Sequence, residues 1–210
     1  MVRIAILPVL LVIAGLAASA DMAARDAFVL SCQLFPVDAT AGDFAARFGA
    51  ANVVDGQVYL GEGEYEAGTI LFTDVPEQRA EITWQQPAVK RAPKMMRIRG
   101  AKSRWRTPQG LTLGLALPTV ERLNRRPFRL WGFDWDYGGT TTSWSGGMLS
   151  HAESPTCKVW ARFSRDEQPL SSEESHLAAQ VSGEREFSSG HPGMQAAHAR
   201  VGAAGLFWQQ

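Results

Sequence analysis

The chain has 210 residues, of which 21 are basic and 21 acidic, so its formal net charge is zero. This balance excludes the positive field typical of nucleic-acid-binding proteins, and no block of like charge marks an interaction tail. Phe, Trp and Tyr make up 10% of the residues, which excludes a chain disordered by composition.

Residues 1–20 have the pattern of a signal peptide. Arg3 precedes the apolar run Ile4–Leu16, and Ala18-Ser19-Ala20 supplies the small residues before a cleavage site. The run is short for a membrane span of about 20 residues, which makes an uncleaved anchor the weaker alternative. We expect cleavage near Ala20, a periplasmic or secreted mature chain, and no stable membrane span after cleavage.

The two cysteines, Cys32 and Cys157, are expected to form a disulfide. An even pair in an exported protein favours a disulfide over metal or catalytic chemistry. Each cysteine also lies on the apolar face of an alternating segment, Phe28–Leu34 or Cys157–Phe163, for which we predict strands. The alternative is two separate buried thiols.

The first predicted helix follows at residues 40–49. Thr40 caps its first turn, Asp43 completes an approximate capping box, and Gly49 suits a left-handed stop. Phe44 and Phe48 form its apolar stripe. Alternating residues between turn signals then predict three strands: Gln57–Leu60, Thr69–Phe72 and Ala80–Trp84.

A second helix is predicted at Leu117–Asn124, about 75 residues further along. Pro118 fits its first turn, Val120 and Leu123 share a face with Leu117, and Asn124 takes the stop position. Three strands are again expected after the helix: Phe128–Phe133, Thr140–Trp144 and Cys157–Phe163. The sequence therefore predicts an α+β fold built by tandem duplication of a short helix and an antiparallel β-meander, with chance spacing as the alternative.

These elements divide the chain into five predicted segments. A basic strand, in which Met96, Ile98 and Gly100 alternate with basic residues, joins the two halves. The segments are a signal peptide (1–20), a first α+β half (21–89), the basic connecting strand (90–106), a second α+β half (107–165) and a C-terminal extension (166–210) with a closing strand at Val201–Trp208.

Several blocks carry a family resemblance. At Gly110–Gly114, Val120–Phe128 and Gly132–Gly139 (GFDWDYGG), the chain resembles an uncharacterised family of exported bacterial proteins, periplasmic or lipid-anchored, and Phe48–Val53 and Phe187–Ser189 look like further blocks. This resemblance implies a soluble periplasmic form and no assigned activity. A looser likeness, in repeat order, is to tandem helix-plus-sheet envelope proteins, which include secreted β-lactamase inhibitor proteins and small outer-membrane assembly lipoproteins. That likeness implies a concave sheet that grips a protein partner.

The segment Trp131–Tyr137 concentrates the candidate chemistry. Strand alternation would place Asp134 and Asp136 on one face, about 6–7 Å apart, as in acid/base pairs or hard-cation sites. We favour a structural role for Asp136, whose carboxylate can accept N–H bonds in the following Gly-Gly turn. The candidates for contact with a partner or ligand are Trp131, Asp134, Trp135, Asp136, Tyr137 and Trp144.

Signals for other chemistry are missing from the sequence. The four histidines are scattered without metal-ligand spacing, no Gly-x-Ser-x-Gly motif exposes a nucleophile, and no glycine-rich loop suits a phosphate. We therefore predict no catalytic, metal or cofactor-binding residues and no cofactor.

The sequence favours an exported, non-enzymatic protein that binds a protein or cell-envelope component. Such a binder should have an open sheet edged by tryptophan and arginine. The alternatives are a carbohydrate-binding module, with Trp131 or Trp135 exposed on a coplanar platform, and a small envelope hydrolase, with acids of the Trp131–Tyr137 segment converging in a pocket.

Overall fold

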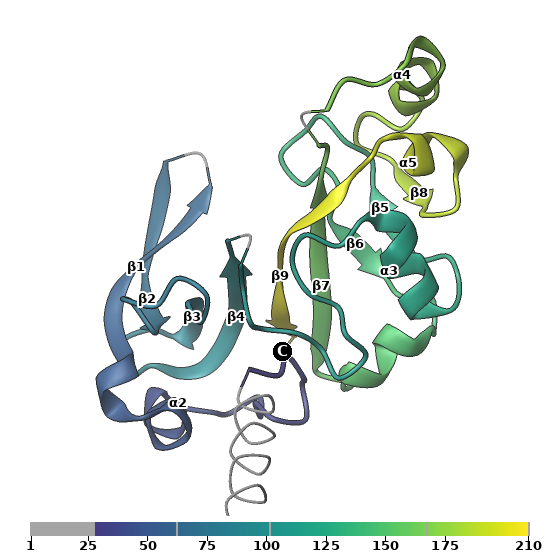
Figure 1. Cartoon of the computed structure of the whole chain (residues 1–210). Helices are drawn as coiled ribbons and strands as arrows, with labels where there is room; N and C mark the ends of the chain where they lie inside the picture. The colour runs from purple at the N-terminus through teal and green to yellow at the C-terminus, as the bar shows by residue number, and fades with distance from the viewer. Residues whose placement is uncertain (1–27, 62, 101, 167, 210) are drawn as a thin grey trace, which may run out of the picture.

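A computed structural model describes residues 28–61, 63–100, 102–166 and 168–209 (Figure 1). The expected signal peptide, residues 1–20, lies outside the described residues. The described chain has short helices and two antiparallel sheets, which confirms the α+β class.

The larger sheet has six strands and joins the two halves of the molecule. Its strands follow the order β1 (Val53–Gly61), β2 (Glu64–Leu71), β3 (Ala80–Gln86), β4 (Arg91–Arg99), β9 (Arg200–Trp208) and β7 (Cys157–Ser164). The predicted closing strand is thus β9, and it lies between β4 and β7 rather than at an edge. Of the predicted basic connecting strand, residues 90–106, the part Arg91–Arg99 forms β4, one face of which enters the core with Met96 and Ile98.

The smaller sheet and most of the helices lie on the right-hand side of Figure 1. The strands of the smaller sheet follow the order β6 (Thr141–Ser143), β5 (Arg129–Trp131) and β8 (Glu186–Ser188). The helical elements of this part are α3 (Leu117–Asn124), η2 (Met148–Ala152), α4 (Ser172–Ala179) and α5 (Pro192–Ala196). A single cluster of buried apolar side chains runs through both halves and packs them together.

Both predicted helices are present. In α2 (Ala41–Phe48), which the short 3₁₀ segment η1 (Ala50–Asn52) follows, Thr40 and Asp43 form the capping box. Gly49 ends this helix with a φ of 87°. In α3 the left-handed residue is Arg125, with a φ of 60°, and not Asn124 as predicted. Asn124 instead ends the helix with a buried side chain that bonds two main-chain segments, which explains why a polar residue occupies this position.

The predicted tandem duplication is not confirmed, because the two halves differ in strand order. Strands β1 to β4 form one continuous meander, whereas β5 and β6 belong to the smaller sheet and β7 pairs with β9. The physical reason is that the C-terminal extension supplies partners, β8 and β9, that have no counterpart in the first half. The two halves therefore share a similar order of helix and turns along the chain, but their strands pair differently.

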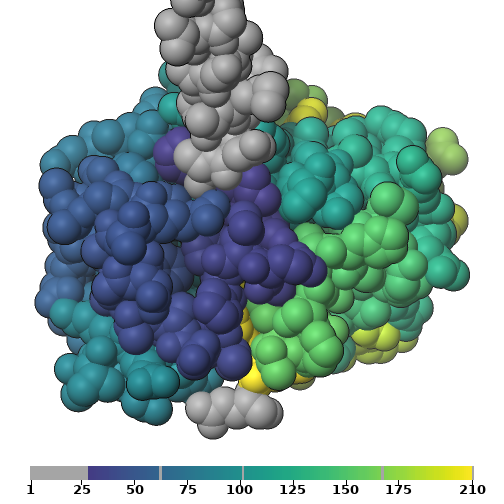
Figure 2. All heavy atoms as spheres, turned by 90° about the horizontal axis from the view of Figure 1, so that it is seen from below, coloured from purple at the N-terminus to yellow at the C-terminus, as the bar shows by residue number. Residues whose placement is uncertain are grey.

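The predicted disulfide between Cys32 and Cys157 is present, with an S–S distance of 2.12 Å. The strand predicted around Cys32 is not. The segment Phe28–Leu34 forms turns with one bridge to Arg106, because its amides bond to main-chain oxygens of several different segments. Seen from below, the N-terminal described residues lie between the two halves (Figure 2). The disulfide thus ties this segment to β7 of the second half.

The β1–β2 hairpin curls over one face of β3 and β4. A side chain at Gly68 would collide with the main-chain oxygen of Ile82, so glycine lets β2 approach β3 closely. The guanidinium of Arg97 on β4 donates to the main-chain oxygen of Tyr59 on β1, although β2 and β3 lie between these strands in the sheet. The face that carries Arg97 is therefore concave.

Candidate binding groove

A groove opens between the tip of the β1–β2 hairpin and the turn after β5. Its volume is about 610 Å³. One side is formed by the hairpin and the other by the turn and β7; the lining residues are Tyr59, Leu60, Gly61, Glu64, Trp135, Asp136, Tyr137 and Arg162. We call this feature the groove. It is built from segments that are distant in the sequence and that only the fold brings together.

The face of β4, β9 and β7 opposite the core continues the groove. Because paired residues of antiparallel strands point to the same side, the register places the outward residues of these strands in rows. We call this surface the open face. Its three rows are Arg99–Ala203–Arg162, Arg97–Gly205–Trp160 and Met95–Phe207–Lys158.

The middle row is shaped by Gly205. A Cβ at this position would lie 3.0 Å from Nε1 of Trp160, so the indole ring extends over the glycine. This Nε1 is buried and has no hydrogen-bond partner among the described residues. We did not select Trp160 from the sequence. The signal was present, however, because the alternation that puts Cys157 in the core puts Trp160 and Arg162 on the other face.

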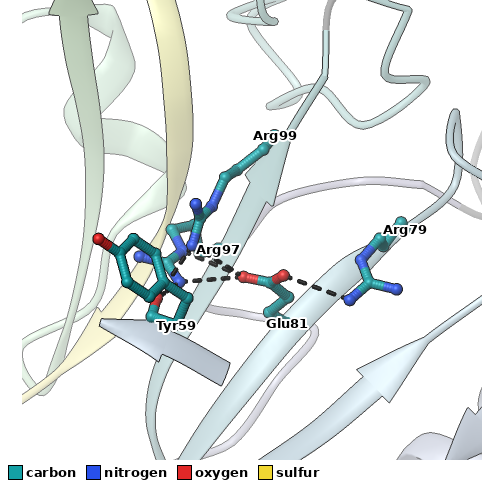
Figure 3. A network of polar contacts seen from close by, with 5 residues as sticks. All are labelled: Tyr59, Arg79, Glu81, Arg97 and Arg99. Carbon is teal, nitrogen blue, oxygen red and sulfur yellow. Dashed lines mark hydrogen bonds and ion pairs between the residues drawn. The ribbon is translucent and has the colours of Figure 1, made fainter. Parts of the chain in front are cut away.

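Glu81 holds three arginines beside the open face (Figure 3). Its carboxylate lies 3.4 Å from Arg79, 3.0 Å from Arg97 and 3.2 Å from Arg99. The side chains of Glu81 and Arg97 are only 14% and 11% exposed. Burial, followed by the neighbouring charge of Arg99, lowers the pKa of Arg97. One carboxylate thus balances three guanidinium groups, and the cluster keeps an excess of positive charge.

Arg162 adds a further cation on the opposite side of the open face. Its Nε donates to the main-chain oxygen of Gly138 at 3.1 Å, and no carboxylate in the described chain pairs with it. Glu64 and Asp136 are exposed at the two sides of the groove and form no ion pair with described residues. The open face therefore carries positive charge from arginine side chains, and one acidic residue lies on each side of the groove.

The two candidate carboxylates do not share a strand face as predicted, because β5 ends at Trp131 and the chain turns at Asp134, whose φ is 68°. The carboxylate of Asp134 accepts a hydrogen bond from Ser182 at 2.6 Å and lies 3.0 Å from Arg165. Asp134 therefore connects three segments and takes a structural role. The geometry needed for an acid/base pair or a shared cation is absent here.

The expectation that Asp136 stabilises the turn is wrong. The amides of Gly138 and Thr140 bond to the main-chain oxygens of Trp135 and Tyr137, at 2.9 and 3.1 Å. The turn is closed by its own backbone, and Asp136 accepts no hydrogen bond from the described residues. It is an exposed charge on the side of the groove.

The aromatic candidates separate into two groups. Trp131 and Trp135 are partly buried and meet edge to face, with ring centroids 5.5 Å apart and planes at 86°, and Tyr137 packs on Trp135. Tyr137 is 66% exposed. Trp144 is only 2% exposed and donates to the main-chain oxygen of Val159. It is a core residue, so its place among the predicted contact residues is wrong; it directly follows β6 and packs against Phe128.

The histidines lie outside the groove lining, and among the described residues no group of three or more His, Cys, Asp and Glu side chains could hold a metal ion. Within the described ranges, no helix has the length and apolar character needed to cross a bilayer. Comparisons with protein-family models, curated proteins and solved structures found no match. The resemblance seen in the sequence therefore stays a prediction.

Proposed function

We propose that this chain is an exported, non-enzymatic protein that binds a protein or cell-envelope component in the groove and on the open face. The observation that carries the proposal is a concave sheet face edged by arginine, tryptophan and tyrosine. These three residue types are the ones most enriched at the energetic centres of protein interfaces.

The two candidate acids argue against catalysis. Asp134 lies outside the groove lining and is held by Ser182 and Arg165, and Asp136 lies on the groove side without a hydrogen-bond partner among the described residues. General acid–base catalysis needs a positioned proton donor or acceptor whose geometry a second group fixes. Neither acid has that arrangement with respect to the groove. A hydrolase is therefore the less supported alternative.

A carbohydrate-binding module is also less supported. Sugars stack on aromatic rings that present parallel flat faces to solvent, whereas Trp131 and Trp135 are nearly perpendicular. Their edge-to-face packing uses the ring surface that a platform would leave free. The aromatic side of the groove is better suited to irregular protein surfaces.

Export is supported by the disulfide between Cys32 and Cys157, because disulfides persist in oxidising compartments. The proposed signal peptide makes a separate prediction: the mature chain should begin near Asp21. Cell fractionation with N-terminal sequencing tests this, and a cytoplasmic, uncleaved chain would contradict it.

Binding through the groove can be tested with a photo-crosslinking amino acid. We expect it to capture a protein or envelope component when it replaces Tyr137, which is 66% exposed beside the groove. Val89, in the turn between β3 and β4, is also 66% exposed but lies outside the groove lining, and it is the matched control. Adducts at Tyr137 and not at Val89 support the proposal. Equal adducts at both positions, or none at Tyr137, refute it.

A further inference from the structure

We propose that the partner of the groove is a protein that inserts an acidic segment, with one carboxylate placed between Arg99 and Arg162. This inference rests on the proposed function and names the chemistry of its ligand. It follows from the spacing of the two arginines, the uncompensated charge around them and the nature of the groove sides.

The spacing suits one carboxylate. Arg99 and Arg162 occupy the same row of the open face, separated only by Ala203 on β9. Two interstrand steps place their Cα atoms about 10 Å apart. Ala203 between them has a small side chain, and both arginine side chains are exposed. The Arg99 guanidinium faces Glu81 and the main-chain oxygen of Tyr59, and that of Arg162 faces the main-chain oxygen of Gly138. Both long side chains would turn toward one carboxylate above Ala203 and bind it from opposite sides with charge-assisted hydrogen bonds.

The charge of this row is not balanced within the described chain. Arg99 shares the single carboxylate of Glu81 with Arg79 and Arg97, and Arg162 bonds only to a neutral main-chain oxygen. Arg97 and Arg99 repel each other across a partly buried cluster. An incoming anion would reduce this repulsion, and it would give Arg162 the charged partner that the described chain does not supply.

The sides of the groove favour a polypeptide over a continuous polyanion. Glu64 and Asp136 stand on opposite sides, where they repel a ligand that carries negative charge along its whole length. Leu60, Tyr137 and Phe207 are large exposed apolar groups on the groove sides and the open face. They suit apolar side chains next to the acidic residue. A polyphosphate or the surface of an anionic bilayer carries negative charge throughout and does not place apolar groups next to a single acidic group.

The test is a selection of short random peptides on the full disulfide-bonded chain. We expect the selected peptides to carry Asp or Glu beside apolar residues, and amide replacement of that acid to weaken binding. R99Q and R162Q should each weaken binding of a selected peptide about tenfold, as expected for loss of a charge-assisted hydrogen bond. R162K, which keeps the charge but loses the planar fork, should fall between R162Q and the native chain.

Arg79 provides the matched control. It binds the same Glu81 carboxylate but lies on the side away from Tyr59, Arg97 and Arg99 (Figure 3). R79Q should therefore leave peptide affinity within about twofold of the native chain, because its charge is farther from the ligand and screened by solvent. Melting curves of all variants show whether each is folded. R162Q, whose side chain is outside the Glu81 cluster, keeps the test valid if R99Q is unstable.

Three results would overturn the inference. The first is selected peptides that lack acidic residues, and the second is R162Q and R99Q variants that bind them as the native chain does. The third is binding of phosphatidylglycerol vesicles through these arginines while no peptide is selected. The last result would assign the open face to an anionic lipid. If Tyr137 adducts persist in an R99Q/R162Q double variant, the proposed function stands and only the acidic ligand is refuted.

Discussion

Replacement of Glu81 by Gln is the most direct test of the charge cluster that shapes the open face. Gln has nearly the same volume as Glu and keeps one oxygen acceptor, so the change removes mainly the negative charge. In the native chain this charge faces Arg79, Arg97 and Arg99, and it is the only carboxylate that the described chain places against them. Without it, three guanidinium groups face each other.

The expected cost follows from burial. Glu81 and Arg97 are 14% and 11% exposed, so their pairing is screened little by water. Loss of one partner of such a buried pair costs about 3–5 kcal/mol. The lower end applies here, because Gln retains an acceptor and Arg99 is 41% exposed, which allows it to turn toward solvent. A loss of about 3 kcal/mol should lower the melting temperature by about 6–12 °C in a chain of this size.

The assay is thermal and urea unfolding followed by circular dichroism, with R79Q as control. Arg79 is one-third exposed and lies 3.4 Å from Glu81, so R79Q should cost at most about 1 kcal/mol. The double variant E81Q/R97M should recover part of the loss, because no buried charge is then left unpaired. If E81Q melted within about 2 °C of the native chain, the cluster would be as weak as a surface ion pair and the reasoning would be refuted.

Three further predictions concern other parts of the fold. Replacement of Cys32 and Cys157 by Ser should cost about 4–5 kcal/mol, at the chain-entropy limit for a cross-link that spans 125 residues, and a melting temperature that hardly changes would contradict this. Asp134→Ala should cost about 1 kcal/mol of unfolding free energy, whereas Asp136→Ala should cost less than about 0.5 kcal/mol; the reverse order in urea unfolding would restore the turn role that the structure denies to Asp136. Burial raises the pKa of Glu153 above its usual 4.5, so the folded chain holds this proton more tightly and loses stability as the pH rises through that range. Glu153→Gln should therefore gain stability relative to the native chain as the pH rises above about 4.5, and a difference in urea unfolding that stays constant with pH would refute this.

Local order was predictable because it depends on neighbouring residues. Thr40 and Asp43 cap a helix wherever that segment is placed, and Pro118 favours a first helical turn for the same reason. Alternation in Cys157–Phe163 separates a buried face from an exposed one without knowledge of the partner strand. The strand prediction from alternation failed at Phe28–Leu34. Apolar residues alternate there, but the backbone amides bond to main-chain oxygens of separate segments instead of one neighbouring strand.

The candidate site was predicted only in part. The part Trp135–Tyr137 of the predicted segment lines the groove, together with Arg162 and Tyr59. Which residues point outward depended on tertiary contacts: Trp144 enters the core, and Asp134 turns away to Arg165. A window of sequence cannot distinguish these cases, because burial is set by segments far away in the chain.

The sequence by itself indicated the α+β class, the two short helices α2 and α3, and Cys32 and Cys157 as disulfide partners, since each follows from short-range periodicity or from a single pair of residues. Only the tertiary structure decided that the C-terminal strand β9 joins β4 to β7 and that the β1–β2 hairpin curls over one face of β3 and β4. Strand pairing between distant segments is a competition among many similar apolar edges, and its outcome depends on the packing of the whole core. The row that places Arg99 beside Arg162 exists only because that competition brought β9 between their strands.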